Sequence, residues 1–177
     1  VDVPTSETVG NYARHLASLT ASSWRLADED IALLTWAARL HEIGIGISQK
    51  HYNRHSAYVI ENSDMPGFSQ GDQIVMSRLL RGHRGKLPPY IFDDIPSKKR
   101  EKFARMLVLL RLAVILKHAG PTTIEPDFTA RAKGEKLKVR FPDAWRRTHP
   151  LTLWEVSESK TAFEKLGVKV RITNEHT

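Results

Sequence analysis

The sequence predicts an α+β fold, in which a mainly α-helical bundle is followed by a small antiparallel sheet with one packed helix. Up to about residue 118, apolar residues recur at spacings of three and four, which is the period of an amphipathic helix. Beyond this point apolar and polar residues alternate, which is the period of a half-buried strand. Because the two patterns occupy separate parts of the chain, helices and strands are expected to segregate.

Helices can be placed in the first part from apolar spacing and turn residues. The opening segment reads as helix, and a second helix is expected from Asp28 to Gly44, where a glycine at positive φ would end it. Further helices are expected at residues 52–62 and 70–81. The longest begins at Ser97 and is apolar nearly all round, which is typical of a helix buried at the centre of a bundle.

Three strands are expected in the last part. They cover residues 128–133, 136–141 and 168–172. Gly134 contributes to a tight turn between the first two, and an amphipathic helix at residues 153–166 leads to the third. The sequence therefore predicts a helical domain at residues 1–118 and a small α/β terminal domain at residues 119–177.

Composition excludes several classes of protein. The 177 residues contain no cysteine, so disulfides, thiolate zinc sites and cysteine nucleophiles are excluded. No segment reaches the roughly 18 consecutive apolar residues of a membrane span, and the chain start lacks the regions of a signal peptide. We expect a cytoplasmic protein, with peripheral association with the inner membrane left open. The first residue is Val1, and we expect a fragment of a longer protein.

The formal net charge of +7 is unevenly distributed along the chain. Residues 1–77 carry a net charge of −4, residues 78–118 one of +8, and residues 119–177 one of +3. Such a local excess of positive charge attracts polyanions. The alternative is a basic surface that serves only solubility.

Histidines gather between residues 36 and 86. His41 precedes Glu42, His51 and His55 share one helical face, and His83 lies between glycines in the motif GHRGK. The zinc motif HExxH is excluded, because position 45 is isoleucine. From the residues alone, a metal site and a set of hydrogen-bonded core histidines both remain open.

Three motifs carry a resemblance to a known family. HEIG, RHSAYVIENSDMPGF and GHRGKL together resemble the C-terminal region of the bacterial exopolyphosphatase and guanosine pentaphosphate phosphohydrolase (Ppx/GppA) family. The resemblance implies a helical HD-like domain and a small terminal domain that help to bind inorganic polyphosphate and to build a homodimer. It also implies that the catalytic Glu and Mg²⁺ belong to N-terminal actin-like domains outside this sequence. We therefore expect no catalytic residue, metal or cofactor in this fragment.

The same resemblance implies a vestigial HD metal site. Its residues are His41, Glu42, His55 and His83, with Arg111 nearest to the place where a closing Asp ligand is expected. A guanidinium in that place would repel a divalent cation, because Arg keeps its proton at working pH. It could instead hold a carboxylate such as Glu42, or a phosphate.

Polyphosphate carries about one negative charge per phosphate, so a set of Lys and Arg side chains can hold it without base recognition. The candidates are Arg78, Arg81, Arg84, Lys86, Lys98, Lys99 and Arg100 in the helical part and Lys136, Lys138 and Arg140 on a strand. For any one of these side chains the plain alternative is a solvated surface cation.

Three functions follow from these patterns. The first is a polyphosphate-binding fragment of an exopolyphosphatase, which supports processive hydrolysis and has no turnover of its own. The second is an autonomous HD-type metal-dependent phosphohydrolase. The third is an RNA-binding module, which is disfavoured because Phe128 and Phe141 fall on the apolar strand faces and leave no exposed aromatic to stack bases. The sequence does not decide between polyphosphate and guanosine pentaphosphate as substrate.

Overall fold

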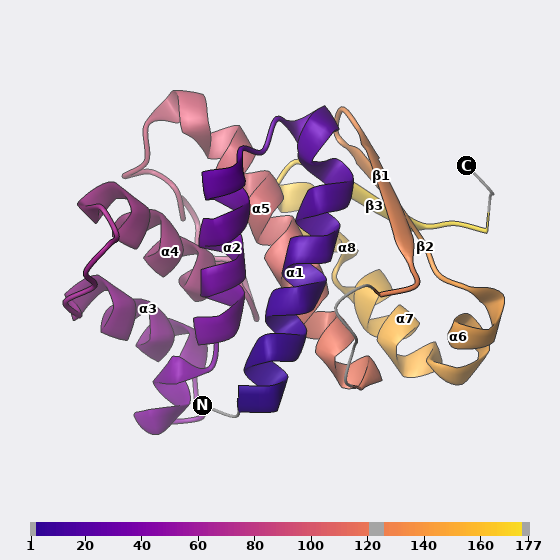
Figure 1. The fold of residues 1–177 in the computed structure, drawn as a ribbon, viewed down its shortest axis with the longest axis horizontal. Coiled ribbons are helices and arrows are strands. Elements are labelled where there is room, and N and C mark those ends of the chain that lie inside the picture. Colours follow the sequence, from indigo (N-terminus) through magenta and orange to yellow (C-terminus); the bar gives the residue numbers. More distant parts are fainter. Residues whose placement is uncertain (1–2, 121–125, 175–177) are drawn as a thin grey trace.

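The computed structural model describes residues 3–120 and 126–174 and confirms the α+β fold (Figure 1). The first part contains α1 (Val3–Trp24), α2 (Asp28–Leu40), the 3-10 helix η1 (Ile43–Gly46), α3 (Tyr52–Asn62), α4 (Gln70–Gly82), α5 (Ser97–Leu116) and the 3-10 helix η2 (Lys117–Ala119). The second part contains β1 (Thr129–Lys133), β2 (Lys136–Arg140), α6 (Asp143–Thr148), α7 (Pro150–Glu158), α8 (Lys160–Lys165) and β3 (Lys169–Ile172). In Figure 1, α1 and α2 lie side by side, with α3 and α4 on one side of them and the sheet on the other.

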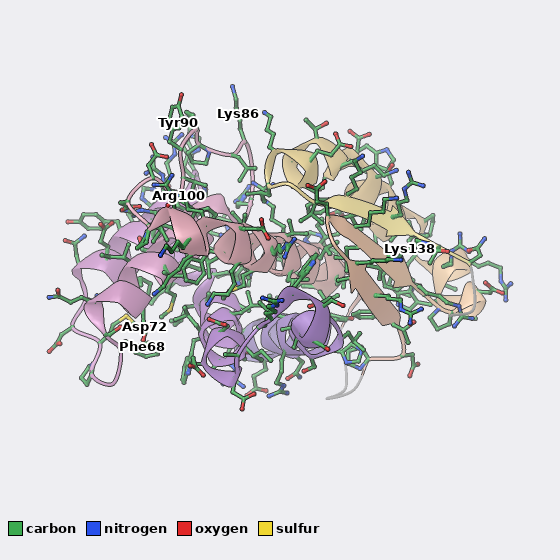
Figure 2. The ribbon with its side chains drawn as sticks, turned by 90° about the horizontal axis from the view of Figure 1, so that it is seen from above. Phe68, Asp72, Lys86, Tyr90, Arg100 and Lys138 are labelled. Carbon is green, nitrogen blue, oxygen red and sulfur yellow. The ribbon has the colours of Figure 1, made fainter. Side chains whose placement is uncertain are left out.

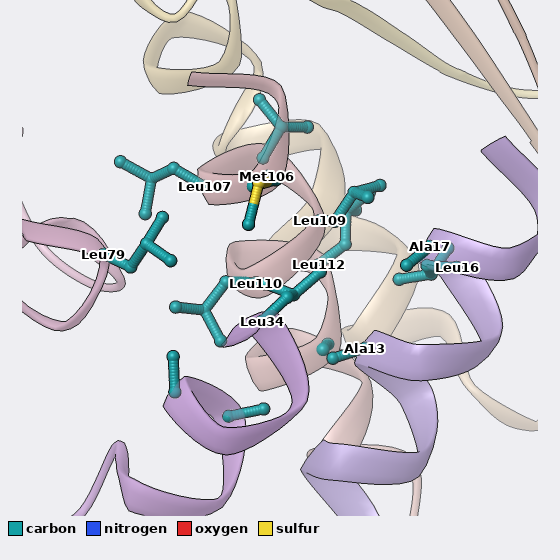
Figure 3. Close-up of a cluster of buried hydrophobic side chains, with 14 of the residues drawn as sticks. Ala13, Leu16, Ala17, Leu34, Leu79, Met106, Leu107, Leu109, Leu110 and Leu112 are labelled. Atoms are coloured by element: carbon teal, nitrogen blue, oxygen red, sulfur yellow. The ribbon is translucent and has the colours of Figure 1, made fainter. Parts of the chain in front are cut away.

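Helix α5 forms the centre of the bundle, as predicted. Every residue from Met106 to Val114 is buried, including Arg111. Figure 3 shows leucines of α5 meeting side chains of α1, α2 and α4, such as Leu16, Leu34 and Leu79. No helix within residues 3–120 and 126–174 is both long and apolar enough to cross a membrane.

The sheet is mixed rather than wholly antiparallel. Strands β1 and β2 pair antiparallel, as expected, whereas β3 runs parallel to β2. The reason is the connection between β2 and β3, which contains α6, α7 and α8, because a crossover of this length returns the chain to the same end of the sheet. The single helix expected at residues 153–166 is divided at Ser159 into α7 and α8, and α6 precedes them.

The sheet packs against α1 through one continuous apolar core. The Trp24 indole N–H donates to the Gly134 carbonyl at 3.0 Å, which ties the β1–β2 turn to the end of α1. The rings of Tyr12 and Phe128 stack with their centres 6.1 Å apart, and His15 Nε2 lies 2.9 Å from the Phe128 carbonyl oxygen. The proposed domain boundary near residue 118 stays a prediction.

Gly44 has a role other than the one expected from sequence. Helix α2 ends at Leu40, and Gly44 lies in η1 without a positive φ. A Cβ on Gly44 would lie 2.3 Å from the Ser56 backbone nitrogen and 2.4 Å from the Tyr52 carbonyl oxygen. The Gly44 N–H donates to the Ser56 hydroxyl at 2.8 Å, and this hydroxyl donates to the His41 carbonyl at 2.9 Å. Glycine is therefore required because the backbone of α3 packs directly on it.

We predict that Gly44→Ala destabilises the chain by about 2 to 3 kcal/mol, because the added methyl overlaps rigid backbone atoms. Gly46→Ala is the matched control, since no atom lies within 4 Å of a Cβ built there. The measurement is urea unfolding of both variants. Equal unfolding midpoints for the two variants would contradict the prediction.

Candidate functional site

A buried histidine follows α2, and both of its ring nitrogens have partners. His41 is 0% exposed, and its Nδ1–H donates to the Ala38 carbonyl at 2.6 Å. This bond leaves a lone pair on Nε2, and the Lys117 ammonium lies 3.2 Å from it. Lys117 also donates to Glu42 Oε1 at 3.2 Å. One ammonium group therefore bridges the imidazole and the carboxylate of the His41–Glu42 pair.

Lys117 is the site residue that sequence analysis missed. It follows α5 directly, and its only sequence signal is a lone cation at the end of a long apolar helix. Arg111, which was considered as a partner for Glu42, takes other partners. Its guanidinium donates from Nε to the Gly82 carbonyl and from Nη2 to the Gly85 carbonyl, each at 2.7 Å. Arg111 thus holds the GHRGK turn, while Lys117 neutralises Glu42.

His83 lies next to this group. It is 2% exposed, and its Nδ1–H donates to the Leu80 carbonyl at 2.5 Å. Its ring centre lies 5.4 Å from that of His41, with the two planes nearly perpendicular, and 5.4 Å from that of Tyr52. The Nε2 atom of His83 is buried without a hydrogen-bond partner among the described atoms. A buried imidazole acceptor is therefore left unsatisfied at this place.

Both imidazoles are held in the neutral form. Burial and the nearby Lys117 ammonium lower the pKa of His41 to about 4, and burial together with His41 lowers the pKa of His83 well below 6.5. Burial also lowers the pKa of Arg111 to about 10, so this group stays cationic near neutral pH. Neutral imidazoles are competent metal ligands, but the lone pair of His41 already accepts from an ammonium ion.

The remaining predicted histidines do not join this group. His51 is exposed and precedes α3 with a φ of 55°, and His55 is half-buried on α3. The rings packed against His83 are those of His41 and Tyr52. Within residues 3–120 and 126–174, no three His, Asp or Glu side chains lie together so that they could hold a metal ion.

A cavity of about 480 Å³ opens beside the GHRGK turn and is lined by basic side chains. Arg81, Arg84 and Lys86 meet there with Arg54 and His51, which sequence analysis did not include. Asn53, Gly85, Leu87 and two prolines complete the lining, and none of its described residues carries a carboxylate. We refer to it as the basic cavity. It joins residues from α3 and from the end of α4, so its composition depends on the packing of these two helices.

Two other cations of the predicted polyphosphate-binding set, Arg78 and Arg100, have partners within the protein. Arg78 forms ion pairs with Asp94 and Glu61, and the bonds to Asp94 raise the pKa of this guanidinium. Arg100 donates to the carbonyls of Ile95 and Asp93 and so fixes the loop before α5. These two residues have structural roles. Lys98 and Lys99 are exposed in the first turn of α5, where Lys99 lines a different cavity that also contains Glu29, Asp30 and Asp72.

The solvent face of the sheet carries two rows of cations. Lys138 pairs with Arg131 on one side and Arg171 on the other, and Lys136 likewise pairs with Lys133 and Lys169. All six side chains are exposed, and Arg140 is half-buried at the end of β2. We call these six residues the basic sheet face. Like charges directly opposite each other on a sheet repel, so this face presents a concentrated positive charge to solvent. Figure 2 shows Lys86 and Lys138 well apart, so the basic cavity and the basic sheet face are separate surfaces.

The lowered histidine pKa values have a definite effect on stability. The unfolded chain protonates its histidines near pH 6.5, whereas folded His41 does so near pH 4. The unfolded state therefore binds more protons within this window. The contribution to stability is complete above about pH 6.5 and is lost as the pH falls toward 4, at about 1.4 kcal/mol per unit for His41.

We predict that Lys117→Met raises the pKa of His41, because it removes a positive charge beside the ring, and that Glu42→Gln lowers it further, because the carboxylate favours the imidazolium. The measurement is a pH titration of the His41 ring signals by NMR. His51, which is exposed, is the internal reference. Shifts of the same sign in the two variants would show that Lys117 does not bridge this pair.

Comparison with known proteins shows the family of the chain. The family described as Ppx/GppA phosphatase, domain III, matches residues 1–160. A guanosine-5'-triphosphate,3'-diphosphate pyrophosphatase of Pseudoalteromonas translucida is 36% identical over 172 residues, which cover 96% of this chain and 34% of that protein. A protein with the same name from Aliivibrio fischeri is 32% identical over 160 residues, which cover 88% of this chain and 31% of that protein. One from Vibrio vulnificus is 36% identical over 133 residues, which cover 75% of this chain and 26% of that protein. The chain thus spans about a third of the length of the curated relatives that it matches. The earlier resemblance is confirmed, and the chain belongs to the Ppx/GppA phosphatase family.

Proposed function

We propose that this part of the protein binds the phosphate chain of inorganic polyphosphate, while a catalytic unit elsewhere in the full-length protein hydrolyses the terminal phosphate. The basic cavity carries the proposal, because Arg54, Arg81, Arg84 and Lys86 line it together and no carboxylate from the described part of the chain does. A ligand with about one charge per phosphate requires such cations and no base-specific contact. The cavity adjoins residues that Arg111 fixes, so its cations are partly preorganised.

The basic sheet face supplies a second contact for a long chain. Because this face and the basic cavity lie on different parts of the molecule (Figure 2), only a long polyphosphate would reach both. The second contact is then intramolecular and raises the apparent affinity without a new kind of interaction. This favours the retention of long chains between successive cleavages.

The names of the relatives refer to a guanosine phosphate, which also carries a linear phosphate chain. The lining of the basic cavity favours polyphosphate, because among the described residues it contains no Phe, Tyr or Trp, and His51 is its one ring on which a guanine could stack. Tyr52, which follows the lining residue His51 in the chain, is covered by Arg84, whose guanidinium carbon lies 4.3 Å from the ring centre. An RNA ligand is disfavoured on the basic sheet face, because its six residues are all Lys or Arg and include no aromatic ring for base stacking.

An autonomous HD-type metal-dependent phosphohydrolase is the second candidate. It is disfavoured because the Lys117 ammonium contacts both His41 Nε2 and Glu42 Oε1, where a divalent cation would need these donors. For the full-length protein we propose that actin-like domains supply the catalytic Glu and Mg²⁺, and that the subunits form a homodimer. A cytoplasmic location, with peripheral contact to the inner membrane through the basic surfaces, belongs to the same proposal.

We predict that long polyphosphate binds this chain more tightly than triphosphate, and that Arg81→Gln/Lys86→Gln weakens the binding of the long chain about tenfold or more. The reason is the loss of two phosphate contacts. The loss of each contact also makes the negative slope of log affinity against log salt concentration shallower by about 1. Titration calorimetry at several salt concentrations measures both quantities.

The matched control for this double variant is Arg147→Gln/Lys160→Gln, which removes the same charge from exposed positions on α6 and α8 that do not line the basic cavity. It should leave the affinity nearly unchanged. If both double variants lose the same affinity, net charge rather than the basic cavity determines binding, and the proposal fails.

We predict that Lys136→Glu stabilises the chain by about 0.5 to 1 kcal/mol at low salt and at the same time weakens its binding of long polyphosphate. The new carboxylate lies between Lys133 and Lys169 and replaces repulsion by attraction. Thermal unfolding with and without 0.5 M salt, roughly where screening is strong, measures the first effect. A variant that is less stable at low salt, or that binds long chains as well as the original, would contradict the assignment of this face.

A further inference from the structure

A second, smaller cavity lies where the helical part meets α7. Its volume is about 310 Å³, and its lining comes from Tyr52 on α3, from the GHRGK turn, from the last turns of α5, from η2 and from the end of α7. The His118 Nδ1 atom and the Glu155 carboxylate lie 3.0 Å apart at the cavity, and both side chains are partly exposed. We call it the α5–α7 cavity. It shares Arg84 and Gly85 with the basic cavity, and its other lining residues differ from those of the basic cavity and of the sheet face.

The charges around this cavity favour a small dianion. Three cationic side chains line it, Arg84, Arg111 and Lys117, and the described lining holds the carboxylate of Glu155. Glu42 pairs with Lys117 from outside the lining, so positive charge still exceeds negative charge by one. Lys117 uses two of its three N–H groups on His41 and Glu42, and Arg111 uses two of its five on backbone carbonyls. Donors therefore remain for a ligand, and their positions are fixed by the contacts already made.

His83 favours a ligand that carries a hydrogen-bond donor as well as negative charge. Its Nδ1–H is committed to the Leu80 carbonyl, so Nε2 presents a lone pair rather than a proton. This atom is buried, has no partner among the described atoms, and belongs to a residue that lines the cavity. A buried acceptor without a donor is costly, so a ligand that brings its own O–H is favoured over one that brings only acceptors.

We propose that the α5–α7 cavity binds hydrogen phosphate, with one P–OH donating to His83 Nε2 and the other oxygens accepting from Lys117, Arg111 and Arg84. The ligand combines two negative charges with one proton that it keeps across the neutral range. A phosphate monoester loses its last proton near pH 6 and becomes an acceptor-only dianion, as sulfate is at all working pH values. The geometry thus selects inorganic phosphate over both.

This inference goes beyond the binding of polyphosphate and does not rest on it. The ligand is a single phosphate, the cavity is a different one, and the selecting residue is a buried histidine rather than a row of surface cations. Each proposal can therefore fail alone. Arg81→Gln/Lys86→Gln separates them, because neither side chain lines the α5–α7 cavity.

The first test compares three anions on the whole chain at about pH 8, where a monoester is fully ionised. We expect inorganic phosphate to bind roughly tenfold more tightly than sulfate or methyl phosphate, because only phosphate satisfies the buried acceptor. Calorimetry gives the affinities, and the ¹⁵N signal of His83 Nε2 should move with phosphate. Equal affinities for phosphate and sulfate, or an unmoved His83 signal at saturation, would overturn the proposal.

The second test uses variants. His83→Phe keeps a ring in the core but removes the acceptor, so it should abolish the preference for phosphate over sulfate. Lys117→Met should weaken phosphate and sulfate alike, since it removes a charge and leaves His83 in place. Lys160→Met, at an exposed position outside the cavity, should change neither. If His83→Phe does not fold, Lys117→Met decides, and unchanged phosphate binding in that variant refutes the site.

Discussion

The burial of α5 is the constraint on which the rest of the structure depends. A helix that is apolar on every side must be surrounded, and α1, α2 and α4 pack against it for this reason. The one charged residue within its buried segment, Arg111, cannot remain without partners in such an interior. It binds the carbonyls of Gly82 and Gly85, and through them the core fixes the turn that carries Arg84 and Lys86. Core packing and anion-binding geometry are thus parts of one arrangement.

Lys117, directly after α5, likewise has fixed partners within the protein. Its ammonium pairs with Glu42, and burial together with this ammonium keeps His41 unprotonated. Two residues suited to metal binding therefore contact Lys117 instead. The cations that could contact a ligand lie on three surfaces, the basic cavity, the basic sheet face and the α5–α7 cavity. In the proposed functions, the basic cavity and the basic sheet face hold an extended phosphate chain, whereas the α5–α7 cavity holds a single phosphate.

The candidate sites were predictable in part. The cations of the GHRGK motif lie close together in the chain, so their meeting in one cavity was expected, as was the shared face of Lys136 and Lys138 on β2. Arg54 lies on α3 and His51 directly precedes it, and neither could be assigned without the packing of α3 on α4. Arg78 and Arg100 were indistinguishable by sequence from the other cations, because the partners Asp94 and the Ile95 carbonyl are set by the fold of the loop before α5.

The sequence by itself determined the helix limits at residues 52–62, the start of α5 at Ser97 and its central position, because local periodicity and turn residues act within a few positions. Only the tertiary structure decided that β3 runs parallel to β2, that Gly44 serves a close backbone approach, and that Lys117 rather than Arg111 reaches Glu42. These three features depend on contacts between residues far apart in the chain, and such contacts are set by the packing of whole elements rather than by any local pattern.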